Sequence, residues 1–539
     1  MTDRVRTTLS LGLLAAALLA GVPAGAADLP LTRPEATGYD ETSLYADVVE
    51  LLQTVAAQSD RLHLTHFGYS SEGRALPLLV YGAPGDASPE AIAASGKVRV
   101  YLQANIHAGE VCGKEALLVL ARDLAAGRHA EWARSAVVLL APIYNPDGNE
   151  RLNVNGRARQ HGPFGGVGQR ANGRGTDLNR DHVKLDSPEA RALARLYRLY
   201  DPHVVVDFHT TDGTFHGYHL TYSPPLHPNT YAPLVDLRRG DLLPAVTDRI
   251  AREHGWHYYY YGNLPPPYAG NLNWGDELGE DFGWYTYGHQ PRYSSNYAGL
   301  RNRFGILSEA YSYLTFEERI LASLYFAEGI VDYACAHADQ LVRLAADADV
   351  DAIVGRPQAL RADHVRTPEK VEILMGEVAV ELNPYTGGEM LRRQDVIVPV
   401  KVYEYGTFAP TETTVAPAAY CLPDSLAPAV DLLRAHGVQW RVLQRDTTVT
   451  AERFRIDSTR VARQPYEGHV GRTLFGHYET ATQTVGSGSL LVPVDQPLGR
   501  LALYLLEPRS DDGLVAWGLV DRWVTEVDYY PVLRLPLSP

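Results

Sequence analysis

Residues 28–345 alternate short apolar runs with helical patterns. The apolar runs at 98–102, 137–140, 204–208 and 304–307 are rich in β-branched residues and are continuous rather than alternating. Such runs are typical of strands that are covered on both faces. Helical patterns separate them, at 114–126, 187–200 and 316–334. The alternation predicts an α/β domain with a mixed, largely parallel central sheet flanked by helices.

The pattern changes after about residue 345. Residues 371–539 show alternating apolar and polar positions with frequent turns, and one helical stretch near 425–435. This pattern predicts a mostly β accessory domain, built as a sandwich, with residues 346–370 as a connector. The strands are expected at 371–374, 396–400, 490–494 and 501–505.

The first 26 residues have the pattern of a secretory signal peptide. Arg4 and Arg6 precede a short apolar stretch at 9–20, and the small residues 24–26 follow as a cleavage site. The apolar stretch is too short to span a bilayer, and later runs are not apolar enough for it. We therefore expect an exported protein, periplasmic or secreted, with no stable membrane insertion.

Charge and cysteine content narrow the range of partners. The net charge is −15, so the chain repels nucleic acid and anionic membrane surfaces, and neither is an expected partner. Three cysteines do not form a disulfide framework, although a single bridge such as Cys335–Cys421 stays open. The sequence leaves the oligomeric state open.

A histidine and a glutamate follow the first buried strand at a spacing that suits a metal ion. His107 and Glu110 are three residues apart in the stretch 105–110, so an imidazole and a carboxylate can converge on one cation. A catalytic zinc site takes three protein ligands and leaves a position for water. His209, at the end of the strand 204–208, is placed to be the third ligand, because sites in α/β sheets form at strand ends. The pair alone is weak evidence for a metal site, because chance pairs at this spacing are common and a surface turn accounts for most of them.

Several further motifs accompany this pair. They are Gly-Tyr-Ser-Ser-Glu-Gly-Arg-Ala-Leu at 68–76, Asn-Pro-Asp-Gly at 145–148, Thr-Asp-Leu-Asn-Arg at 176–180 and Leu-Ser-Glu-Ala-Tyr at 307–311. In this order and spacing the set resembles the zinc carboxypeptidase family of the carboxypeptidase A type, over roughly residues 35–335. The stretch 504–513 is similar, more loosely, to the extra C-terminal β domain of large bacterial members.

The resemblance implies a catalytic zinc centre. It implies one Zn²⁺ per chain, held by His107, Glu110 and His209. It implies Glu309 as the general base, and Asp177 as the carboxylate that orients the first zinc-binding histidine.

The resemblance also implies residues that bind substrate. Asn179 and Arg180 match the pair that binds the terminal carboxylate of the substrate, for which a guanidinium is well suited. The family has an arginine that stabilises the oxyanion, and spacing favours Arg159 for this role. The other candidates for that role are Arg157, Arg170 and Arg174.

A tyrosine that closes over the substrate is also implied by the resemblance. Tyr285, Tyr287 and Tyr297 are the candidates, and Tyr297 is preferred because Gly299 can act as a hinge beside it.

The predicted function is that of a zinc-dependent exopeptidase that hydrolyses C-terminal peptide bonds. Its expected substrate is a peptide or an amidated amino acid with a free carboxylate. Two alternatives stay open. One is a deacylase or peptidoglycan amidase on the same scaffold, and the other is a non-catalytic zinc-bearing binding protein. The sequence leaves the side-chain specificity open.

Overall fold

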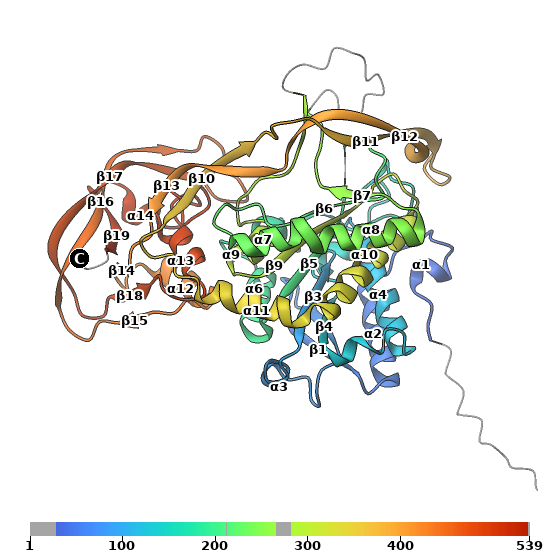
Figure 1. Ribbon diagram of the computed structural model, residues 1–539, viewed down its shortest axis with the longest axis horizontal. Helices are drawn as coiled ribbons and strands as arrows, with labels where there is room; N and C mark the ends of the chain where they lie inside the picture. The colour runs from blue at the N-terminus through green and yellow to red at the C-terminus, as the bar shows by residue number, and fades with distance from the viewer. Residues whose placement is uncertain (1–28, 212, 266–281, 537–539) are drawn as a thin grey trace, which may run out of the picture.

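The computed structural model describes residues 29–211, 213–265 and 282–536 (Figure 1). The predicted signal peptide at 1–26 lies outside this part of the chain. Among the described residues, no helix has the length and apolar character needed to cross a bilayer.

A single eight-stranded sheet organises the first part of the chain. Its four central strands run parallel in the order β4-β3-β5-β9, while β2 and β6 pair antiparallel at their two sides. This arrangement confirms the predicted mixed, largely parallel sheet. In order across the sheet, the strands are β1 (Leu62–Tyr69), β2 (Ala75–Tyr81), β4 (Ala136–Ala141), β3 (Val98–Ala104), β5 (Val204–Thr210), β9 (Phe304–Ala310), β6 (Leu220–Ser223) and β7 (Tyr258–Tyr260).

Helices cover both faces of this sheet, which is why its strands are continuously apolar. On β3, Val100 packs into a core with helices α2, α4, α8 and α10, whereas its neighbour Tyr101 packs with α6 and α9 on the opposite face. Helix α6 begins as predicted, with the Ser187 side chain accepting from the Ala190 amide ahead of a first-turn proline. The covering helices are α2 (Tyr45–Gln58), α4 (Cys112–Ala125), α8 (Leu243–His254), α10 (Phe316–Ala336), α6 (Pro188–Tyr200) and α9 (Ser294–Leu300).

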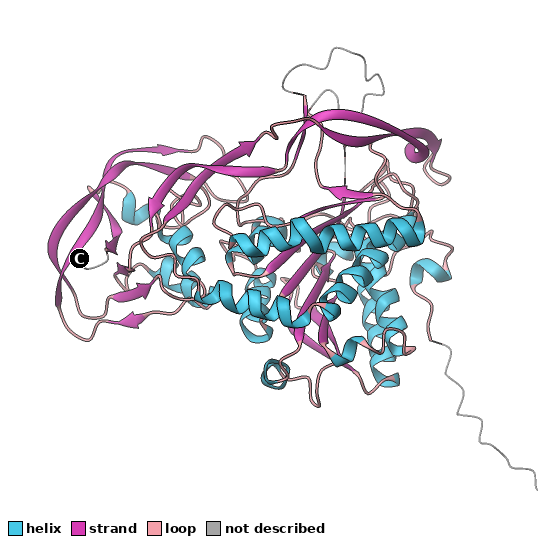
Figure 2. Cartoon of the chain, viewed as in Figure 1, coloured by secondary structure: helices cyan, strands magenta, loops and turns pink. Residues whose placement is uncertain are grey.

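The C-terminal part is mostly β, as predicted, and consists of several sheets (Figure 2). A six-stranded sheet is antiparallel throughout its recorded pairings, and a long hairpin of β11 and β12 adds the short strand β8 at its edge. The three sheets are β10 (Pro357–Val365) with β13 (Thr407–Val415); β11 (Val371–Leu382), β12 (Glu389–Tyr405) and β8 (Gly283–Tyr285); and, in spatial order, β15 (Arg441–Val442), β18 (Leu490–Pro493), β14 (Ala419–Leu422), β19 (Tyr529–Leu535), β16 (Thr447–Val461) and β17 (Arg472–Val485).

The stretch 501–505 is helical, and its prediction as a strand is wrong. It lies in helix α13 (Gly499–Leu506), all of whose residues are buried. A short apolar run that is buried on all sides gives the same sequence signal in a helix and in a strand, and its leucines and alanine favour the helix. Helices α12 and α13 pack on the six-stranded sheet, so the layer that faces this sheet is helical, where the alternating pattern had suggested a second sheet.

The remaining elements are short connections. Cys335 and Cys421 are unpaired, so no bridge joins them. The helices not yet given are α1 (Arg33–Ala36), α3 (Pro89–Ala94), η1 (Trp132–Arg134), α5 (Pro146–Asn149), η2 (Leu178–Arg180), α7 (Ala232–Leu237), η3 (Arg238–Leu242), α11 (Ala338–Val350), α12 (Ala427–His436) and α14 (Asp521–Val524).

Candidate metal centre and substrate pocket

A tight turn after β3 presents the first two candidate ligands. Asn105 adopts a left-handed conformation with φ of 64°, which asparagine tolerates, and this bends the chain out of the strand. The Glu110 amide donates to the His107 carbonyl at 2.9 Å, which closes the turn. A Cβ on Gly109 would lie 2.9 Å from the Gly168 carbonyl oxygen, so the turn has no room for a side chain there.

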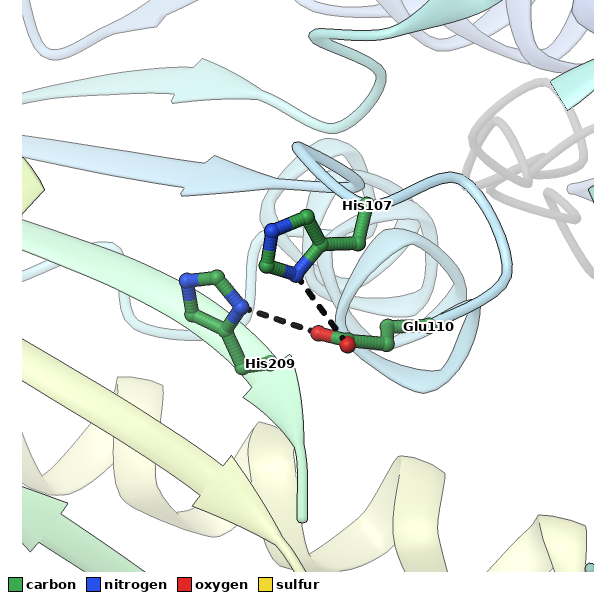
Figure 3. Close-up of side chains that lie close together, drawn as sticks. All are labelled: His107, Glu110 and His209. Atoms are coloured by element: carbon green, nitrogen blue, oxygen red, sulfur yellow. Dashed lines mark hydrogen bonds and ion pairs between the residues drawn. The ribbon is translucent and has the colours of Figure 1, made fainter. Parts of the chain in front are cut away.

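The third candidate ligand comes from β5, next to the predicted base. His209 is the register partner of Glu309 on the parallel neighbour β9, so both side chains project from the same face of the sheet. The rings of His107 and His209 have centroids 4.9 Å apart. The Glu110 carboxylate reaches both rings, with one oxygen 3.1 Å from His107 Nδ1 and the other 2.9 Å from His209 Nδ1 (Figure 3).

The three side chains fit a zinc ion. One ligand atom from each of His107, Glu110 and His209 lies within 4.8 Å of the other two, and all three residues are buried. Two imidazoles and a carboxylate form a known ligand set for catalytic zinc, which keeps one position open for water. The structure therefore brings together the predicted ligand set.

A carboxylate holds the far nitrogen of each imidazole. His107 Nε2 lies 3.1 Å from Asp177 Oδ1, and His209 Nε2 lies 2.9 Å from Asp207 Oδ2. An Nε2–H that donates to a carboxylate leaves the lone pair on Nδ1, which is the nitrogen that faces Glu110. Both histidines are thus oriented as Nδ1 ligands.

Two arginines balance the negative charge beside the ligands. Arg157 Nη2 donates to Glu110 Oε1 at 2.6 Å, and Arg170 Nε donates to Asp177 Oδ2 at 2.9 Å. Burial acts to raise the pKa of Glu110, but His107 and Arg157 outweigh it and hold this pKa well below its usual range. Burial likewise opposes the ionisation of Asp177, yet its hydrogen bond to His107 and the charge of Arg170 lower its pKa.

These groups open onto a pocket of about 220 Å³. Glu309 lines it together with Asn179 and Arg180, which lie on η2. Arg180 lies over the ring of Tyr293, with 4.5 Å from its guanidinium carbon to the ring centroid. The full lining comprises His107, Glu110, Arg170, Asn179, Arg180, His209, Thr210, Tyr261, Tyr287, Tyr293, Ser294, Ser295, Leu307 and Glu309.

Two residues that were predicted to act directly on the substrate do not line this pocket. Arg159 has an exposed side chain, and its carbonyl accepts from the Leu391 amide of β12. Tyr297 is only 1% exposed, and its hydroxyl pairs with His436 Nδ1 at 2.8 Å inside the core. The structure thus does not bring Arg159 or Tyr297 to the pocket, which Arg170, Tyr287 and Tyr293 line instead.

Sequence reasoning also missed Asp207 and Ser294. Asp207 is buried and accepts from the Ser294 hydroxyl as well as from Gln103 Nε2. Asp207 stands two residues before His209 on the same strand, so both side chains point to one face, and this spacing could have identified it.

Comparison with known proteins points to one family. Residues 48–212 match the family model described as zinc carboxypeptidase. Carboxypeptidase 2 of Trichophyton rubrum is 25% identical over 481 residues, covering 86% of this chain and 81% of its own length. Carboxypeptidase D of Homo sapiens is 34% identical over 165 residues, covering 25% of this chain and 12% of its own length.

Part of the chain also aligns with a solved structure. The metallo-carboxypeptidase from Burkholderia cenocepacia aligns with a TM-score of 0.40 and 18% identity, covering 56% of this chain and 71% of that one. The family-model match over residues 48–212 and the curated relatives support the zinc carboxypeptidase family and indicate a metal-dependent peptide-bond hydrolase.

Proposed function

We propose that the protein is an exopeptidase that removes C-terminal residues, with one zinc ion per chain and Glu309 as general base. The observation that carries this proposal is the content of one pocket. The zinc-ligand set, the Glu309 carboxylate and the Arg180 guanidinium all line it. A cation that binds carboxylates, beside a hydrolytic centre, selects the end of a peptide rather than its middle.

Each group in the pocket has a separate role in the proposed reaction. Arg180 and Asn179 hold the terminal carboxylate and so place the last peptide bond near the metal ligands. His107, Glu110 and His209 would hold the zinc ion, which would supply a Lewis acid that polarises a carbonyl and lowers the pKa of water toward ~7. Glu309 takes a proton from the attacking water and returns it to the leaving amine.

Arg170 replaces Arg159 as the proposed oxyanion group. Its side chain lines the pocket, and its hydrogen bond to Asp177 fixes its direction. A fixed cation at this position stabilises charge that develops only in the transition state.

The deacylase and binding-protein alternatives receive less support. The curated relatives are named carboxypeptidases, and the pocket holds a base as well as a metal-ligand set. We further propose that residues 1–26 direct export, on the signal-like pattern of the sequence.

The test combines metal content with product analysis. Purified protein should contain about one zinc per chain and release single C-terminal amino acids from a peptide mixture. A chelator should stop the release and added zinc should restore it, whereas matched peptides with a C-terminal amide should be cleaved poorly. Zinc without release from free C-termini would contradict the exopeptidase proposal, and well-folded protein that cannot bind zinc would contradict the metal centre.

A further inference from the structure

The connection between β16 and β17 ends in a two-residue turn, which an isolated bridge between Tyr466 and His469 closes. Tyr466 and His469 exchange backbone hydrogen bonds at 2.8 and 3.0 Å. Between them, Glu467 and Gly468 are both left-handed, with φ of 49° and 79°. This is the geometry of a type I′ turn, which matches the twist of a hairpin. We refer to residues 466–469 as the hairpin tip.

The hairpin tip contacts the segment that carries the substrate-binding residues. Arg180 Nε donates to the Tyr466 hydroxyl oxygen at 3.0 Å, and the Asp177 amide donates to Glu467 Oε2 at 3.2 Å. His469 Nε2 lies 2.7 Å from Asp186 Oδ2. The hairpin tip therefore contacts residues 177–186 at three points.

Neighbouring side chains fix the hairpin tip in place. The Arg292 guanidinium lies over the rings of Tyr466 and Trp517, at 5.4 and 4.8 Å from their centroids. Arg292 in turn forms an ion pair with the buried Asp512 at 2.8 Å. The hairpin tip thus has a defined position relative to the pocket.

The hydroxyl of Tyr466 restricts the orientation of the Arg180 guanidinium. Arg180 Nη1 donates to the Asn179 carbonyl at 2.8 Å, and the Tyr293 ring lies against the guanidinium face. With Nε held by Tyr466, three separate contacts define how the group is aimed. A guanidinium that is fixed before the substrate arrives loses less entropy when it binds a carboxylate.

Glu467 is an unusual choice for its position in the turn. A left-handed φ is disfavoured for a residue with a side chain, and glycine is the usual occupant of such a site. The carboxylate of Glu467 accepts from the backbone of Asp177, directly before Asn179 and Arg180. Glu467 combines a strained backbone with a contact to the segment that carries Asn179 and Arg180. This combination indicates that Glu467 helps to position that segment.

We propose that the hairpin tip is part of the carboxylate-binding site, with Tyr466 and Glu467 as positioning residues for Arg180 and its segment. This inference rests on the proposed function, because it takes Arg180 as the group that binds the substrate's terminal carboxylate. It gives the accessory β region a direct part in selecting peptides with a free C-terminus.

Binding to a turnover-silent protein tests this role. In zinc-loaded protein that carries Glu309→Gln, calorimetry would compare an N-acetyl dipeptide with its C-terminal amide. Tyr466→Phe keeps the ring and removes only the hydroxyl, and it should weaken binding of the free-carboxylate peptide by about tenfold. Binding of the amide should stay unchanged, because the amide does not use the charge of Arg180.

Glu467→Gly separates positioning from folding. Glycine suits the left-handed turn, so the thermal midpoint should stay equal or rise, while the free-carboxylate peptide should bind several-fold more weakly. Zinc content should stay at the level of the parent protein in both variants. A purely structural role for the turn predicts no such loss of binding.

Tyr385→Phe is the matched control. It removes a hydroxyl that donates to Asp40 at 2.6 Å on another hairpin, and it should leave binding of both peptides unchanged. Equal affinities for the free-carboxylate peptide in the parent, Tyr466→Phe and Glu467→Gly proteins would overturn the inference. Failure of the unsubstituted protein to release amino acids, with these binding differences present, would instead count against the proposed function.

Discussion

Asp207 should determine how tightly the protein holds zinc. It would act through its hydrogen bond to His209 and not as a zinc ligand. It is 1% exposed, and its two oxygens take three donors. These donors are His209 Nε2 at 2.9 Å, the Ser294 hydroxyl and Gln103 Nε2 at 3.2 Å. The perturbation is Asp207→Asn, which has nearly the same shape but lacks the charge.

The hydrogen bonds of Asp207 allow the loss of stability and of zinc affinity in Asp207→Asn to be estimated. If the asparagine oxygen faces His209 and Ser294, its NH₂ group meets the NH₂ group of Gln103. Gln103 cannot turn over without loss, because its own oxygen accepts from Tyr101 at 2.9 Å. One buried donor is left unpaired, which costs about 1–3 kcal/mol of folding stability. The imidazole also loses its anionic partner, which should lower zinc affinity by about 10–100-fold, or roughly 1.4–2.7 kcal/mol.

Zinc affinity measured by competition with a chromogenic chelator near neutral pH is the direct assay. Asp177→Asn should have a smaller effect, because that side chain is 11% exposed and water can replace part of its role. Asp241→Asn is the control, since its carboxylate accepts from Tyr333 in the helical layer. A folded Asp207→Asn protein whose zinc affinity stays within about twofold of the parent would refute the reasoning.

Three further predictions follow from the same geometry. Glu309→Gln should keep zinc content unchanged while kcat falls by about 10²–10⁴-fold, measured by amino-acid release, and kcat near the parent value would remove Glu309 as the base. Arg180→Lys should raise KM for free-carboxylate peptides about tenfold with little change for the amides, because lysine lacks the planar fork, and equal KM values would contradict the clamp. Burial, together with the charge of Arg301, lowers the pKa of His436 to about 3 in the folded protein. As the pH falls below ~6.5, the imidazole therefore takes up a proton in the unfolded chain but not in the folded one. The free energy of unfolding should therefore drop by about 2 kcal/mol for this group between neutral pH and pH 5, and His436→Gln should show a shallower pH dependence in denaturant melts unless the histidine is charged in the fold.

The layers of the fold were accessible from the sequence because burial on both faces leaves a simple signal. The runs 98–102 and 204–208 lie within β3 and β5, and the capping signal at Ser187 begins α6. The prediction of a strand at residues 501–505 was wrong for a physical reason. When every side of a short element is buried, neither period 2 nor period 3.6 appears in the pattern.

The ligand set was accessible because its parts are local. His107 and Glu110 share one turn, and His209 ends a strand that is recognisable by itself. Arg159 and Arg170 lie in a long stretch with little regular structure, where spacing carries no direction. The choice between the two arginines depends on which side chain lines the pocket, and that is determined only by the tertiary structure.

Contacts between the pocket and the C-terminal region join residues that are far apart in the sequence, so the sequence pattern does not predict them. The Arg180–Tyr466 hydrogen bond joins residues 286 positions apart, and Tyr297, predicted to reach the substrate, instead reaches His436 of helix α12. Both contacts tie the segments around the pocket to the β region. His436 also pairs through Nε2 with the carbonyl of Val183, three residues after Arg180, so the pocket wall is in contact with both parts of the chain. We therefore expect that a change in the β region can alter the pocket wall even when it leaves every candidate metal ligand intact.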